Sequence, residues 1–137
     1  MSAVWDIRGP WKIHQAPATT VSVNLLQANK GPGVFPINGD VTGSATSVTP
    51  GGPSLTSKSI TGSIIDNQLC MQIVWTNNTV GEYNGMFGIS DLFPPPSAED
   101  FVQKVRLWGV AWDITNVQDV AAWVSDKQFT APIVTGP

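Results

Sequence analysis

The sequence predicts an all-β fold, an eight-stranded antiparallel up-and-down barrel that forms a single domain over residues 1–137. Short segments in which apolar and polar residues alternate recur along the chain, and turns rich in Gly, Pro and Asn separate them. Most connections are short, whereas a parallel sheet needs a crossover helix between each pair of strands. About eight meandering strands can close into a barrel that has no exposed edge and holds one small ligand. A β-sandwich remains the alternative.

Alternation is strictest in one segment, where Leu69, Met71, Ile73 and Trp75 share a face and the residues between them occupy the other. The remaining expected strands are one around Trp11 and those over residues 21–25, 41–47, 60–65, 79–89, 106–114 and 120–130.

One short helix is expected near residues 98–104. Pro94-Pro95-Pro96 favours an extended segment that cannot join a central strand. Ser97 follows as a suitable cap for a helix N-terminus, and the acidic residues Glu99 and Asp100 would lie in the first turn.

The composition excludes several classes of function. Only 12% of the residues are charged, the net charge is −3 and 7 residues are Lys or Arg, so no basic surface for nucleic acid is expected. No stretch approaches the roughly 18 apolar residues of a spanning helix, which predicts no membrane span. With one cysteine, Cys70, and one histidine, His14, we expect no disulfide framework and no Cys- or His-rich metal site. No cofactor is expected either.

The N-terminal residues Met-Ser-Ala-Val-Trp-Asp contain no basic region followed by an apolar stretch, which is the pattern of a secretory signal. This predicts a cytoplasmic protein or one secreted by an unconventional route. A chain from which a signal had been removed would look the same.

No set of residues predicts catalysis. His14 is expected in a solvent-exposed turn, and the acidic residues are not paired at a spacing typical of general acid–base chemistry. Asp113, Asp119 and Asp126 are interpreted as a solvated face. We therefore expect that the protein is not an enzyme.

Six tryptophans are many for 137 residues. Large aromatic side chains often fill a small core, and Trp5, Trp11 and Trp75 fit that interpretation. Alternatively, tryptophans line a cavity or stack on a flat ligand or a sugar. Trp108 and Trp112 lie four residues apart on one expected strand and therefore face the same side.

Several short motifs follow one another in order along most of the chain. They are Gly9-Pro10-Trp11, Val41-Thr42-Gly43, Ile60-Thr61-Gly62, Ile73-Val74-Trp75-Thr76-Asn77-Asn78, Tyr83-Asn84-Gly85-Met86-Phe87, Trp108, Trp123 and Phe129-Thr130. In this order they resemble the avidin and streptavidin family of biotin-binding barrels.

The resemblance implies an eight-stranded barrel with biotin or another small ligand bound in an aromatic-lined mouth. The ligand-binding residues that it implies, by position, are Trp75, Tyr83, Trp108, Trp123, Ser47 and Thr79. Trp75, Tyr83 and Trp108 would be the aromatic walls, and Trp123 would be lent across a subunit interface. Ser47 would contact the ligand ring, and Thr79 would replace a serine.

Two positions depart from the family in a way that bears on the ligand. Ile13 stands where the resembling proteins have an Asn, and Ala45 where they have a Tyr, both partners of the biotin ureido oxygen. A site built for a polar group loses several kcal/mol when its partners are missing, so biotin is expected to bind weakly.

The leading hypothesis is therefore a non-catalytic small-molecule-binding β-barrel. The first alternative is a carbohydrate-binding protein, or lectin, that uses exposed tryptophans, and the second is a barrel cyclase or isomerase. Because few residues are charged, much of the outer face must be apolar or neutral, which predicts a homodimer or a homotetramer.

Overall fold

A computed structural model of the chain describes residues 2–4, 6–29, 38–65, 68–88, 105–129 and 133–135. Its strands are β1 (Ser2–Val4), β2 (Gly9–Gln15), β3 (Thr19–Asn29), β4 (Asn38–Val48), β5 (Leu55–Ile65), β6 (Gln68–Trp75), β7 (Val80–Gly88), β8 (Val105–Asp113), β9 (Asn116–Phe129) and β10 (Ile133–Thr135).

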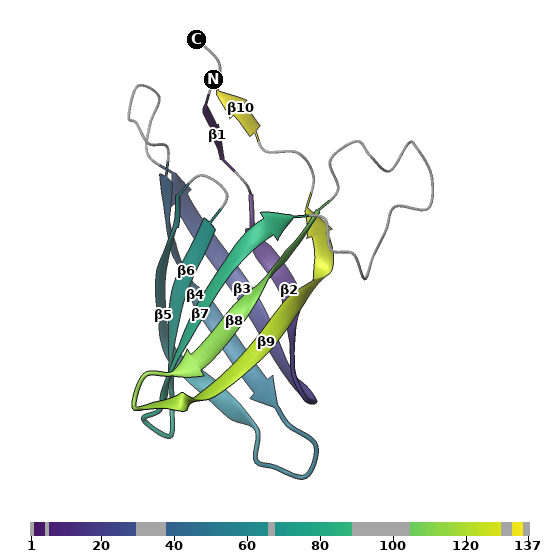
Figure 1. The fold of residues 1–137 in the computed structure, drawn as a ribbon. Coiled ribbons are helices and arrows are strands. Elements are labelled where there is room, and N and C mark those ends of the chain that lie inside the picture. Colours follow the sequence, from purple (N-terminus) through teal and green to yellow (C-terminus); the bar gives the residue numbers. More distant parts are fainter. Residues whose placement is uncertain are drawn as a thin grey trace.

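Strands β2 to β9 form a closed barrel in chain order, and every neighbouring pair is antiparallel (Figure 1). The barrel closes where residues 13–15 of β2 pair with residues 123–125 of β9. Strands β1 and β10 form a separate two-stranded sheet. The predicted eight-stranded up-and-down barrel is therefore confirmed.

The helix expected near residues 98–104 lies outside the described residues. Within the described segments, no helix has the length and hydropathy that crossing a membrane would require.

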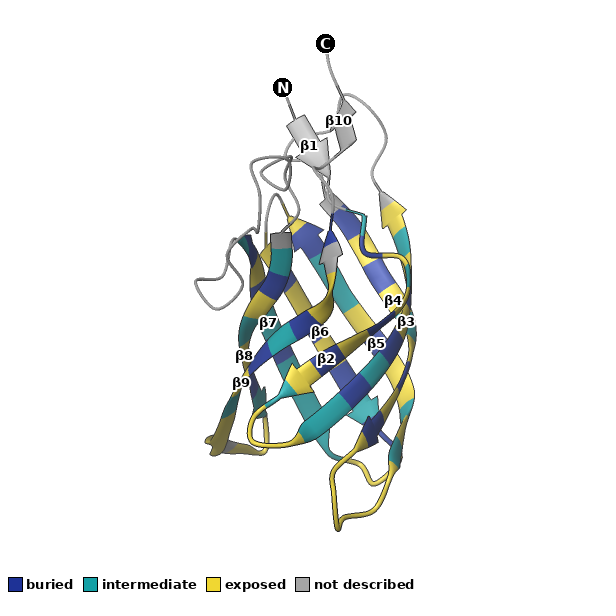
Figure 2. Cartoon of the chain, turned by 90° about the vertical axis from the view of Figure 1, so that its right-hand side faces the viewer, coloured by how far each residue is buried: buried dark blue, intermediate teal, exposed yellow. Residues whose placement is uncertain are grey.

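Buried and exposed residues alternate along the barrel strands, as the period of a pleated strand requires (Figure 2). Strand β6 follows the sequence expectation most closely, because Leu69, Met71, Ile73 and Trp75 all point inward and are buried. The core consequently lies inside the barrel, where it consists of inward rows from all eight strands.

Aromatic side chains close one end of the barrel. The ring of Phe129 packs edge-on against Trp11 and Phe87, with both centroid separations at 5.4 Å. The indole Nε1 of Trp11 donates a hydrogen bond of 3.0 Å to the carbonyl oxygen of Ile7. Trp11 is buried, which bears out the prediction that it lies in the core.

Strand β8 faces the opposite way from what the resemblance implied. Trp108 is 47% exposed on the outer surface, whereas its neighbour Leu107 is buried. The reason lies in the inward row of the sheet, where Gly85, Gly109 and Trp123 are successive partners. Gly85 leaves room inside for the Trp123 ring, and Gly109 allows the backbones of β7 and β8 to approach closely. A strand can present only one of its two faces to the core.

Candidate functional site

At the end opposite the Trp11 plug, four turns surround an open mouth. They comprise residues 16–18, 49–54, 76–79 and 114–115 and lie together in Figure 1. Inside this ring is a cavity of about 210 Å³, called the mouth hollow below.

Four of the six ligand-binding residues that the resemblance implied line the mouth hollow. They are Ser47 at the end of β4, Trp75 at the end of β6, Thr79 in the β6–β7 turn and Tyr83 on β7. Ser47 is only 9% exposed, and its hydroxyl bonds to no other described residue. Because Ser47 lines the mouth hollow, its hydroxyl can form a hydrogen bond with a bound molecule.

The local sequence holds Thr79 beside Trp75. Asn78 adopts a φ of 68°, a conformation that Asn tolerates better than most residues. The backbone N–H of Trp75 donates to the carbonyl of Thr79 over 2.9 Å. The side chain of Asn77 accepts from both the backbone N–H and the hydroxyl of Thr79. The Asn-Asn pair after β6 therefore fixes one wall of the mouth.

Tyr83 and Gln15 form the floor of the mouth hollow. The Tyr83 hydroxyl donates a hydrogen bond of 2.9 Å to Oε1 of Gln15 on β2. Burial raises the pKa of Tyr83 to about 12, so the phenol keeps its proton at neutral pH. Because Oε1 of Gln15 is occupied, its amide nitrogen is the part of the side chain left to donate to a ligand.

Two carboxylates line the mouth hollow as well, Asp113 at the end of β8 and Asp119 on β9. Oδ1 of Asp113 accepts hydrogen bonds from the backbone N–H and hydroxyl of Thr115, which lower its pKa from the ordinary value. Asp126 lies far along β9, where it accepts from the backbone N–H of Lys12. Asp119 and Asp126 are exposed, as the interpretation expected, but the three aspartates do not share one face.

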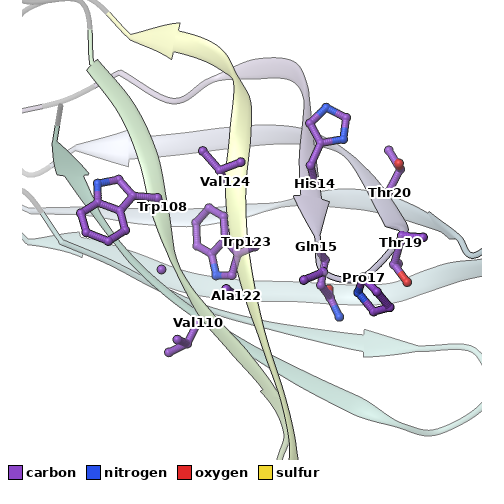
Figure 3. A pocket seen from close by; sticks show the side chains of 13 residues that line it. His14, Gln15, Pro17, Thr19, Thr20, Trp108, Val110, Ala122, Trp123 and Val124 are labelled. Carbon is purple, nitrogen blue, oxygen red and sulfur yellow. The ribbon is translucent and has the colours of Figure 1, made fainter. Parts of the chain in front are cut away.

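Trp108 lines a different depression, on the outside of the barrel. Figure 3 shows this outer groove, of about 740 Å³, between Trp108, Val110 and Val124 on β8 and β9 and the turn that contains Pro17. A second outer hollow of about 420 Å³ lies on the other side of Trp108, over β6 and β7. Trp108 is thus a ridge between two depressions, separate from the mouth.

Trp123 lies inside its own barrel and is 3% exposed. Its ring packs against Tyr83 with centroids 6.3 Å apart, and its Nε1 is buried with no hydrogen-bond partner among the described residues. The implied role of a residue lent to a neighbouring subunit stays a prediction; in this structure the Trp123 side chain fills the space beneath the mouth of its own barrel.

Sequence reasoning missed Gln15, Asp113 and Asp119 as mouth residues. The signal that would have found two of them is strand parity: Asp119 lies an even number of residues from the inward Trp123, and Asp113 from the inward Leu107. Gln15 likewise continues the inward row of Trp11 and Ile13.

Among the described residues, no group of three or more His, Cys, Asp or Glu side chains is arranged to hold a metal ion. Comparisons with family models, with curated proteins and with solved structures find no match.

Proposed function

We propose that this protein is a non-catalytic binding protein that holds one small molecule in the mouth hollow of its barrel. The observation that carries the proposal is the convergence of Ser47, Trp75, Thr79 and Tyr83 from separate elements on one cavity. Aromatic surface and a few hydrogen-bonding groups in a concave site are the usual composition of small-molecule sites.

The size of the mouth hollow limits the ligand. Its volume of about 210 Å³ is below the range of roughly 300–1,000 Å³ that is common for drug-sized ligands. Tyr83 and Trp123 fill the barrel beneath it. The ligand is therefore a small molecule, or a larger one of which a single group enters the mouth.

Biotin is not the ligand that the mouth selects. Ile13 and Ala45, which stand where the resembling proteins bind the ureido oxygen, are both buried members of the core. No polar side chain at these two positions is available to meet such a group.

The carbohydrate alternative rested on exposed tryptophans. Trp108 is the most exposed tryptophan of the described residues, and its neighbours in the outer groove include Val110, Ala122 and Val124. A sugar presents many hydroxyls that need polar partners, so this surface does not favour a lectin.

Titration calorimetry with the purified protein and a panel of small cations, neutral alcohols, acids, monosaccharides and biotin tests the proposal. Ser47→Leu fills the mouth hollow and is expected to abolish binding of any ligand that the wild type takes up. Ser44→Leu is the matched control, since it makes the same change on β4 at an exposed position. Equal binding by both variants, or no binding of any compound, contradicts the proposal.

We also propose that the outer face of β6–β9 joins two copies of this chain. Trp108, Val110 and Val120 are exposed apolar side chains on this face, and a monomer seldom leaves such a patch open. Trp108 stands between two depressions, so a two-fold axis could seat each Trp108 against the other copy. Asn84 lies on the same face with Oδ1 buried and unpaired among the described residues, and an amide can pair with its symmetry mate.

Light scattering measures this assembly. The wild type is expected at twice or four times the monomer mass of 14.6 kDa, and Trp108→Lys at the monomer mass. Val48→Lys, at an exposed apolar position on β4, is expected to assemble like the wild type. A monomeric wild type contradicts the assembly and leaves the mouth proposal unaffected.

A further inference from the structure

The mouth hollow has an uncompensated negative charge. Asp113 and Asp119 approach it from the two strands of the β8–β9 hairpin. The carboxylate of Asp113 accepts hydrogen bonds from Thr115 and from the backbone N–H of Asn116. Asp119 forms no hydrogen bond or ion pair with another residue of the described part of the chain. Asp119 therefore has its oxygen atoms available to a bound molecule, and Asp113 contributes its negative charge at the rim.

No Lys or Arg lines the mouth hollow. Lys58 lies at the edge of this rim, where its Nζ donates a hydrogen bond of 2.6 Å to Oδ1 of Asn78. The remaining described cationic residues do not line the mouth hollow, and they are Arg8, Lys12, Arg106 and Lys127. The electrostatic potential inside the mouth is consequently negative, and a negative potential repels anions and attracts cations.

Aromatic rings face the same space. Trp75 and Tyr83 both line the mouth hollow, and Gly81 lies between them. A Cβ at Gly81 would lie 3.0 Å from Cε1 of Tyr83 and 3.6 Å from Nε1 of Trp75, so the glycine leaves the space beside these two largely buried rings unfilled. The face of an aromatic ring attracts a cation, most strongly when the cation is removed from water.

We propose that the mouth hollow selects a small organic cation, an amine or a quaternary ammonium group. This inference rests on the proposed function. The two carboxylates supply the charge, and the rings of Trp75 and Tyr83 supply the wall against which the alkylated nitrogen packs. The hydroxyl of Ser47, nine-tenths buried and unpaired among the described residues, accepts or donates one orienting hydrogen bond. We do not propose a metal ion as the ligand, because two carboxylates provide too few of the oxygen ligands that a metal ion such as Ca²⁺ requires.

The test compares choline with 3,3-dimethylbutan-1-ol, which has the same shape but carbon in place of the charged nitrogen. Titration calorimetry at low ionic strength is expected to give choline an affinity at least about tenfold higher. Raising the salt concentration is expected to weaken choline binding and to leave the alcohol unchanged.

Variants in which one aspartate becomes asparagine show which carboxylates attract choline. Asp113→Asn and Asp119→Asn are each expected to weaken choline binding about two- to fivefold without changing the affinity for the alcohol. Asn at position 113 keeps the oxygen that accepts from Thr115, so the turn is retained. Asp126→Asn, which makes the same charge change on β9 away from the mouth, is expected to bind choline like the wild type.

Two failures are distinguishable. If the alcohol or an anion binds as well as choline and Ser47→Leu abolishes that binding, the charge selection is overturned and the mouth remains a binding site. If no compound of any charge binds, or if binding persists in Ser47→Leu, both this inference and the proposed function are overturned.

Discussion

The hydroxyl of Tyr83 on β7 donates a hydrogen bond of 2.9 Å to Oε1 of Gln15 on β2, joining two strands that are not neighbours in the barrel. This bond crosses the interior directly beneath the mouth hollow. It fixes the floor of the cavity and points the amide nitrogen of Gln15 away from Tyr83. The shape of the candidate site therefore depends on a contact between residues 68 positions apart in the sequence.

Replacing Tyr83 with Phe is expected to lower the free energy of unfolding at neutral pH by about 1 kcal/mol, because Oε1 of Gln15 loses its donor. At alkaline pH we expect Tyr83→Phe to be more stable than the wild type. The pKa of Tyr83 is raised to about 12 in the folded protein, so the stability tied to the neutral phenol is complete below about pH 10 and is lost as the pH rises to about 12. Phe does not ionise, so the variant escapes this loss of about 2–3 kcal/mol.

Urea denaturation of both proteins across this pH range measures the difference. Tyr83 is the one tyrosine in the chain, so the absorbance of tyrosinate reports its titration directly. A midpoint near 10 in the folded protein would contradict the burial of the phenol.

Gly85→Ala is expected to destabilise the barrel by about 1–3 kcal/mol through overpacking. The added Cβ would lie 2.6 Å from Cζ2 and 2.7 Å from Cη2 of Trp123. In a Trp123→Phe background the penalty of Gly85→Ala should fall, because the two positions share one space. Thermal unfolding of the four proteins in this cycle gives the coupling energy, and an equal penalty in both backgrounds would place the Trp123 ring elsewhere.

Trp75→Ala and Trp108→Ala are expected to differ sharply in their effect on stability. Trp75 is a buried core residue, and its truncation should cost about 3–5 kcal/mol. Trp108 is 47% exposed, and its truncation should cost less than about 1 kcal/mol in the monomer. Denaturation at a concentration where all proteins share one oligomeric state compares them, and similar costs would refute the assigned orientation of β8.

Biotin is expected to bind in the micromolar range or more weakly. The buried side chains of Ile13 and Ala45 offer no hydrogen bond to a ureido oxygen, and the negative mouth disfavours the biotin carboxylate. Calorimetry measures the affinity, and a nanomolar dissociation constant would contradict this account of the mouth.

The strands and the barrel could be predicted from local patterns. The orientation of β8, that is, which of its faces points into the barrel, could not. The alternation of Leu69, Met71, Ile73 and Trp75 shows its inner face at once because only one face of β6 is continuously apolar. Strand β8 has apolar residues on both faces, so its own sequence does not determine which face is buried.

The deciding information for β8 is non-local. Gly85 on the neighbouring strand leaves the space that the Trp123 ring occupies, and register then turns Trp108 outward. The same dependence on register hid Asp113 and Asp119, whose alternation predicts a side of the sheet only when the inward side is known. Trp75 and Thr79 were implied by the resemblance alone, and the short β6–β7 turn holds both beside the mouth.

The most direct test of ligand binding in the mouth is the resonance of the Trp75 indole N–H in a nitrogen–proton correlation spectrum during titration with small cations, alcohols and acids. Single Trp→Phe variants assign the indole signals. We expect at least one compound to shift the Trp75 signal in a saturable manner while the Trp108 signal on the outer face stays in place. A titration that shifts only Trp108, or that leaves Trp75 unmoved by every compound, would contradict binding at the mouth.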